Sequence, residues 1–278
     1  MKPARSTYRA LAAGAVIALA AGIAACGGSD APAPTPTSRP AAEVTDGTTP
    51  TPAVVETDEA TEPAEPADPA DPTEPDEPQW IIDTEQKTPA EGTTGNVTVA
   101  GTTVTVGNPD AEKRAHIYMD FFCPHCVTLH ELMADDLEEW AAGDDVAVEY
   151  TLVDYLGPRT THIYSARAAN LLAYVADTDP ASYTAVMDAL LAAKPETTTE
   201  EVTDEHLLQI ARDAGATLGE DAPSALARLS YYRWVEAGTQ EAAAAGITGI
   251  PQVWVDGARV AGDGHEATAE LVREALGG

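Results

Sequence analysis

A repeat with proline at every third position, between residues 63 and 78, is the feature that most restricts what this 278-residue chain can fold into. Each of these prolines follows Glu or Asp, and they are Pro63, Pro66, Pro69, Pro72, Pro75 and Pro78. A polyproline II helix has three residues per turn, so the prolines would line one face and the carboxylates another. The rest of residues 26–92 is mostly Pro, Ala, Thr, Glu and Asp, which cannot form a hydrophobic core. We expect a disordered linker here, which leaves residues 93–278 to fold, a size typical of one domain.

The N-terminus has the pattern of an export signal. Three basic residues precede a short, Ala-rich apolar run over residues 10–25, which is a poor permanent membrane span. The run ends in "IAAC", which resembles a bacterial lipobox: a branched apolar residue, two small residues and a cysteine. We therefore predict that residues 1–25 are a lipoprotein signal peptide and that Cys26 carries the lipid. The alternative is a plain secretory signal whose cleavage site lies near Cys26.

Charge and cysteine count narrow the possible partners and chemistry. The formal net charge is −31, from 15 basic and 46 acidic residues, and no block of basic residues is present. This charge argues against nucleic acid and anionic membrane surfaces as partners, because phosphate binding needs clustered Lys and Arg. The chain has three cysteines, and if Cys26 is acylated, only Cys123 and Cys126 remain for thiol chemistry.

Hydrophobic periodicity after the linker predicts an α/β fold. The expected elements are a hairpin over 97–106, a strand over 115–122, a helix over 123–142, a strand over 146–153, helices between 162 and 245, a strand–turn–strand over 247–262 and a helix over 265–276. Gly143 is the expected end of the first helix, and Thr203 is a possible N-cap within the helical stretch.

Cys123 and Cys126 enclose Pro124 and His125 where a strand is expected to give way to a helix. Backbone N–H groups at a helix N-terminus stabilise a thiolate, so the pKa of Cys123 should fall, and a protonated His125 would act in the same direction. Cys126 lies one turn further on, where it could resolve a mixed disulfide. A structural disulfide closing so short a loop would remove little chain entropy.

Three other uses of the pair stay open from the residues alone. Zinc would need two further Cys or His ligands, and the remaining histidines form no second pair at a suitable spacing. Copper is compatible with thiolates, but no Met cluster supports it. An inert structural pair is the third alternative.

The segments "GNPDAEKRAHIYMDFFCPHC" and "GITGIPQVWVDG", with a helical stretch between them, resemble the DsbA-type branch of the thioredoxin superfamily. The resemblance covers residues 104–277 and implies a thioredoxin-like α/β fold with a helical insertion over about 160–245. It implies that Cys123 is the nucleophile, that Cys126 is the resolving thiol, and that the two alternate between thiols and a disulfide. Pro124 and His125 would tune the pair.

The same resemblance implies that Pro251 is a cis-proline facing the cysteines, and that Ile250 pairs its backbone with a substrate peptide. One position departs from the family, whose members often bury an acid six residues before the first active cysteine, where this chain has Ile117. Asp120 is either a substitute proton acceptor or an exposed acid at the strand end.

The function we expect is that of a lipid-anchored thiol:disulfide oxidoreductase on the outer face of a bacterial cell membrane. It would form disulfides in reduced exported proteins without a metal or cofactor, and a quinone-linked membrane partner would reoxidise it, as the resemblance implies. The alternatives are a reductase or thiol donor with the same site, and a non-catalytic, metal-carrying lipoprotein.

Overall fold

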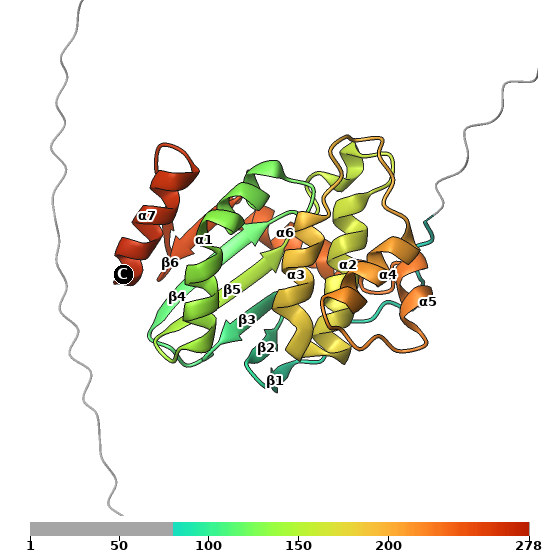
Figure 1. Cartoon of the computed structure of the whole chain (residues 1–278), viewed down its shortest axis with the longest axis horizontal. Helices are drawn as coiled ribbons and strands as arrows, with labels where there is room; N and C mark the ends of the chain where they lie inside the picture. Colours follow the sequence, from blue (N-terminus) through green and yellow to red (C-terminus); the bar gives the residue numbers. More distant parts are fainter. Residues whose placement is uncertain (1–79, 278) are drawn as a thin grey trace, which may run out of the picture. The chain divides into compact units, whose positions relative to one another are not determined.

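A computed structural model describes residues 80–277. The expected signal peptide, Cys26 and the proline repeat lie outside the described residues. The described part contains a seven-stranded mixed sheet in the order β1-β2-β3-β5-β4-β6-β7 (Figure 1). The strands are β1 Gly92–Thr94, β2 Val97–Ala100, β3 Thr103–Gly107, β4 Lys113–Met119, β5 Val146–Leu152, β6 Gln252–Val255 and β7 Ala258–Val260.

β4, the strand that leads to the cysteines, lies inside the sheet between β5 and β6. β4 pairs in parallel with β5 on one side and antiparallel with β6 on the other. Its residues alternate between buried and half-buried, as expected for a strand with unequal faces. β6 follows Pro251, so this antiparallel pairing brings the cis-proline loop to the edge where β4 ends.

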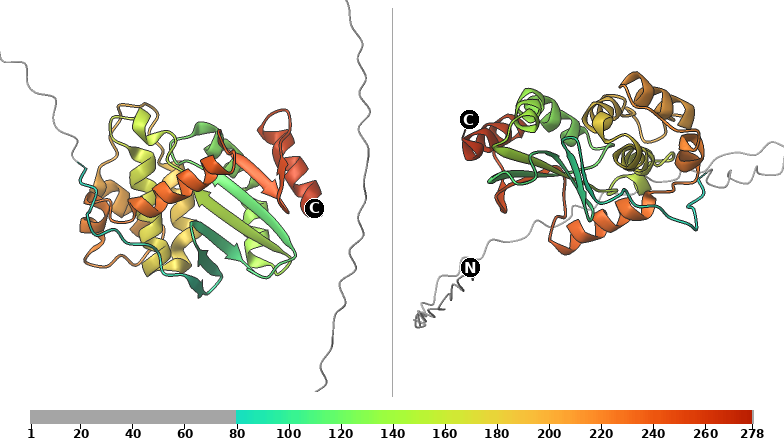
Figure 2. Two further views of the ribbon diagram at one scale, coloured as in Figure 1. Left: turned by 180° about the vertical axis from the view of Figure 1, so that it is seen from behind. Right: turned by 90° about the horizontal axis from the view of Figure 1, so that it is seen from below.

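Three helices cover the sheet. α1 Pro124–Ala142 and α7 His265–Leu276 pack together on one face, and α6 Tyr232–Ala244 crosses the other face (Figure 2). α1 buries Cys126, Leu129, Met133 and Leu137, which recur at helical spacing. It ends at Gly143, as the sequence predicts.

The helical insertion lies beside the sheet (Figure 1). It consists of α2 Tyr164–Thr178, α3 Tyr183–Ala192, α4 Asp204–Asp213 and α5 Ala222–Ala227, with short 3-10 turns at Gly157–Arg159 and Pro180–Ser182. Thr203 accepts a hydrogen bond from the N–H of His206, which confirms it as the N-cap of α4. The chain between 222 and 244 forms two helices, and Leu229 lies between them with a φ of 47°.

Residues 80–91, which composition assigns to the linker, instead lie against the helical insertion. The N–H of Asp83 donates to the carbonyl of Arg228, and the N–H of Lys87 donates to that of Ser230. The Asp83 carboxylate also pairs with the Arg228 guanidinium at 3.0 Å. From these contacts we propose that the domain starts before residue 93, because a single Trp and a few polar groups hold a segment that looks polar on average.

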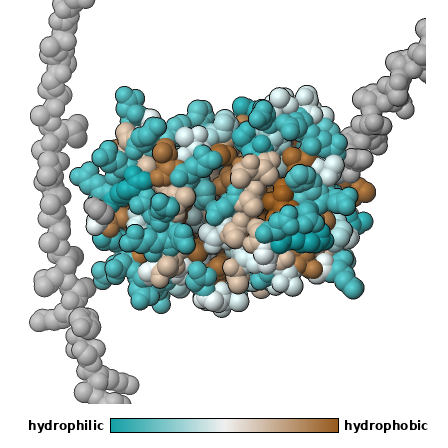
Figure 3. All heavy atoms as spheres, in the orientation of Figure 1, coloured by the Kyte–Doolittle hydropathy of each residue, from teal (hydrophilic) through white to brown (hydrophobic). Residues whose placement is uncertain are grey.

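Polar residues cover most of the molecular face seen in Figure 3, with apolar residues in small patches between them. Between residues 80 and 277, no helix is both long and apolar enough to cross a bilayer.

Candidate active site

Cys123 occupies the junction between β4 and α1. It is the N-cap residue of α1, with extended φ and ψ of −77° and 113°, and Pro124 follows in the first turn. Proline is favoured there because the first helical N–H groups have no intrahelical partner. The carbonyl of Cys123 accepts hydrogen bonds from the N–H groups of Cys126 and Val127 at 3.0 and 3.2 Å. Both thiols are free and buried, with Cys123 3% and Cys126 2% exposed.

The two thiols differ sharply in acidity. A hydrogen bond from the Cys126 thiol, followed by the backbone N–H groups of Cys126 and His125, lowers the pKa of Cys123 to about 7, against the opposing effects of burial and the Asp120 charge. Burial raises the pKa of Cys126 well above its usual range, and the neighbouring Cys123 adds to the effect. Cys123 is therefore the sulfur that is readily ionised near neutral pH.

The cis-proline loop faces this pair. The Ile250–Pro251 peptide bond is cis, as the resemblance implies. The Cys123 Sγ donates to the carbonyl oxygen of Ile250 at 3.8 Å, and Pro251 and Cys126 line the same small cavity. The structure thus brings together Cys123, Cys126, Ile250 and Pro251, four of the six residues that the sequence predicts for the site, from two segments more than 120 residues apart.

His125 is arranged differently from the expectation. Its backbone N–H, and not its ring, bonds to the Cys123 sulfur. The ring stacks on that of His265, with centroids 5.1 Å apart and planes 16° from parallel. Both rings line a cavity of about 270 Å³ beside Pro251. Sequence reasoning missed His265, whose only signal is its place at the start of the last helix.

Asp120 is fully buried beneath the redox pair, so the interpretation as an exposed strand-end acid is wrong. Its carboxylate accepts hydrogen bonds from the N–H groups of Phe122 and Leu156, at 2.8 and 2.9 Å, and from the Ser165 hydroxyl. Burial nevertheless raises its pKa. Ile117, where the family often has an acid, is a buried apolar residue of β4.

A second buried carboxyl lies next to Asp120 and was not predicted. Burial and the charge of Asp120 raise the pKa of Asp154 to about 6. Asp154 accepts hydrogen bonds from the Gly157 N–H and the Tyr232 hydroxyl, both at 3.0 Å. Asp154 comes just after β5, and the sequence around it carries no motif that would reveal its burial.

The described residues contain no group of three or more His, Cys, Asp or Glu side chains that could hold a metal ion. The metal-carrying alternative therefore has no candidate site between residues 80 and 277.

Comparisons with known proteins agree with this geometry. A sequence model of the thioredoxin family matches residues 99–275. MdbA of Corynebacterium diphtheriae, described as a thiol-disulfide oxidoreductase, has a similar structure, with 20% identity, 66% of this chain and 95% of that chain covered, and a TM-score of 0.54.

Two further solved structures share the fold. Oxidised BdbD of Bacillus subtilis has 20% identity, with 68% of this chain and 100% of that chain covered and a TM-score of 0.53. Oxidised DsbA of Mycobacterium tuberculosis has 22% identity, with 63% and 93% covered and a TM-score of 0.50. No curated protein matches the sequence significantly. At these identities, the likeness to solved structures establishes the fold.

Proposed function

The chain belongs to the thioredoxin family, and we propose that it is a protein thiol:disulfide oxidoreductase that forms disulfides in exported proteins. The observation that carries the proposal is the inequality of the two thiols beside the cis-proline. Cys123 has a pKa of about 7, whereas burial keeps Cys126 protonated. A nucleophile and a resolving thiol need this difference.

The reaction follows from these positions. A substrate thiolate attacks Cys123 Sγ of the oxidised pair, which breaks the Cys123–Cys126 bond and releases Cys126 as a thiolate that takes up a proton. A second substrate thiolate then attacks the substrate sulfur of the mixed disulfide. Cys123 leaves as a thiolate, the substrate gains a disulfide, and two electrons pass to the pair. The Ile250 carbonyl and the Pro251 loop are the backbone against which the substrate segment would lie.

The acidity of Cys123 supports donation of disulfides. A pKa of about 7 leaves about half of Cys123 as thiolate at pH 7. This charge is stabilised only in the reduced state, because a disulfide sulfur carries none, so the reduced pair is favoured and the disulfide becomes a better oxidant.

The buried Asp120 favours the alternative, a reductase or thiol donor. Its charge acts to raise the pKa of both cysteines, which opposes the thiolate and favours the disulfide. The equilibrium of the pair with glutathione separates the two functions. We expect a potential above about −200 mV for a disulfide donor, and a potential near the roughly −270 mV of thioredoxin would assign the reductase function instead.

The membrane location is part of the same proposal and rests on the N-terminal sequence. An export signal ending at a lipidated Cys26 would hold the domain outside the cytoplasm, where disulfides persist. Reduced exported proteins would be the substrates. A quinone-linked membrane protein would return the pair to its oxidised state.

A further inference from the structure

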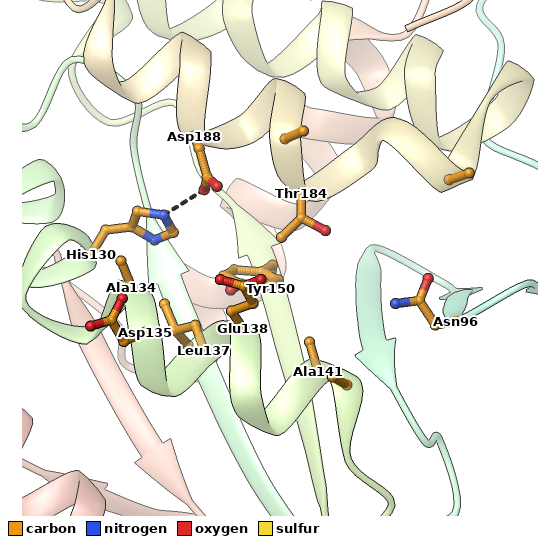
Figure 4. A pocket seen from close by; sticks show the side chains of 13 residues that line it. Asn96, His130, Ala134, Asp135, Leu137, Glu138, Ala141, Tyr150, Thr184 and Asp188 are labelled. Atoms are coloured by element: carbon orange, nitrogen blue, oxygen red, sulfur yellow. Dashed lines mark hydrogen bonds and ion pairs between the residues drawn. The ribbon is translucent and has the colours of Figure 1, made fainter. Parts of the chain in front are cut away.

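A second cavity of about 460 Å³ opens between α1 and α3, away from the cysteines. In Figure 4, His130, Asp135 and Glu138 project from α1 on one side, Thr184 and Asp188 from α3 on the other, and Tyr150 of β5 lies between them. Its volume falls within the range of small-molecule sites. It shares α1 with the redox centre but none of the residues that form that centre.

The charges around the cavity select a cation. Asp135 and Glu138 on α1 and Asp188 on α3 line it, and no Lys or Arg does. The Nε2 of His130 lies 2.7 Å from an oxygen of Asp188 and joins the two walls. The carboxylates are spread over both walls rather than converging, and the described residues hold no group suited to a metal ion. An elongated organic cation fits this distribution better than a single ion.

Tyr150 provides an independent sign of a ligand. Its side chain is 1% exposed and lines the cavity, and its hydroxyl makes no hydrogen bond within residues 80–277, where only the Tyr183 hydroxyl is both fully sealed from solvent and without a partner. Burial, the neighbouring Tyr183 and the charge of Asp188 raise its pKa, so the hydroxyl stays protonated and its oxygen can accept a hydrogen bond. The Tyr150 hydroxyl is therefore accessible only from the cavity, where an ammonium group would donate to it in place of water.

The remaining lining is mostly alanine, with one larger apolar residue, Leu137, and one polar residue, Asn96. The alanines are Ala134, Ala141, Ala142, Ala181 and Ala185. Methylene groups between two charges can lie along such a surface, as the aliphatic stems of lysines do.

We propose that this cavity binds an aliphatic polyamine. One ammonium group pairs with Asp135 and Glu138 on α1, and another pairs with Asp188 and donates to the Tyr150 hydroxyl. The methylene chain between them covers the alanines.

Titration calorimetry of the full chain with spermidine, in about 0.15 M salt to screen long-range attraction, tests the proposal. A charge-assisted hydrogen bond is worth about 1.5–3 kcal/mol, so Glu138→Gln and Asp188→Asn should each weaken binding about tenfold. Tyr150→Phe removes only the hydroxyl and should weaken binding about threefold. Butylamine, with one charge, should bind at least about tenfold more weakly than spermidine.

Glu139→Gln is the matched control, because Glu139 is an exposed acid on the same helix that does not line the cavity. It should bind spermidine like the unaltered chain. The acidic N-terminal region is present in every variant, so its contribution cancels. Equal affinities for all variants would show general attraction to a chain of net charge −31 and overturn the proposal. Equal affinities for butylamine and spermidine would overturn the two-wall binding mode.

Discussion

At the scale of single residues, the different roles of the two thiols, nucleophile and resolving thiol, follow from their positions one helical turn apart. Cys123 is the N-cap residue of α1 and its sulfur accepts hydrogen bonds, whereas Cys126 points into the core and its thiol donates one.

Cys126→Ser should therefore trap mixed disulfides with substrate proteins, because attack by Cys123 survives and resolution does not. Non-reducing gels after acid quenching would show the adducts. Cys123→Ser is the matched control and should trap few, and adducts that depend on Cys126 would reverse the assignment.

The source of the low Cys123 pKa can be tested by two substitutions. The Cys126 thiol makes the largest contribution, and the His125 contribution comes from its backbone N–H, which alanine keeps. Cys126→Ala should therefore raise the pKa of Cys123 more than His125→Ala does. Ultraviolet absorbance of the thiolate against pH measures both. A larger shift in His125→Ala would return the tuning role to the imidazole ring, as the sequence alone predicts.

Asp154 should make stability depend on pH. Its pKa is raised from 3.8 to about 6, so the folded state binds its proton more tightly than the unfolded state. The stability from this group is present below about pH 4 and is lost as the pH rises through about 6, a loss of about 3 kcal/mol at 1.36 kcal/mol per pKa unit.

Asp154→Asn keeps the shape and the hydrogen-bond positions but carries no charge. The variant should match the unaltered chain in free energy of unfolding at pH 4 and exceed it by up to about 3 kcal/mol at pH 7.5. Urea unfolding at both pH values provides the measurement. If the free energies of unfolding of the two chains differ by the same amount at pH 4 and pH 7.5, then ionising Asp154 does not destabilise the folded state.

At the scale of elements, the sequence predicts a helix or strand correctly where its hydrophobic periodicity and its capping or turn residues indicate the same element. The hairpin of β2 and β3, α1 with its end at Gly143, and the Thr203 cap of α4 follow from the sequence for this reason. The break at Leu229 was left open, because an apolar residue with positive φ has no sequence signature. In the site, motif residues were predictable, but Asp154 and His265 were not, because only tertiary packing places them there.

Residues 80–91 form an ordered segment that the amino-acid composition does not predict. Trp80 covers the buried Arg167, whose guanidinium carbon lies 4.3 Å from the ring centroid. The two backbone hydrogen bonds of this segment to Arg228 and Ser230 alone contribute about 1–3 kcal/mol.

A chain that begins at residue 80 should therefore melt at the same temperature as the full chain, and a chain that begins at residue 93 should melt several degrees lower. Scanning calorimetry of the three chains provides the comparison. Equal melting temperatures for the chains from 80 and 93 would mean that the segment only rests on the surface and that the domain starts at residue 93.

At the scale of the whole molecule, we expect membrane attachment and the redox reaction to depend on separate parts of the chain. All residues of the redox site lie within the described residues, whereas the proposed anchor is Cys26, more than 50 residues before them. The proposed lipid on Cys26 would hold the chain at the membrane, and all the groups that set the Cys123 pKa lie between residues 120 and 126.

Cys26→Ala should therefore move the protein from the membrane fraction to the soluble fraction, with the redox potential and the Cys123 pKa unchanged. Cell fractionation, the mass of the mature N-terminus and a glutathione titration measure the three properties. Gly28→Ala, which keeps the cysteine and alters a neighbouring small residue, is the control and should stay in the membrane fraction. An unmodified mature N-terminus at another position would contradict the anchor. A changed redox potential in Cys26→Ala would instead show that the N-terminal region influences the redox site, because Cys26 is not one of the site residues.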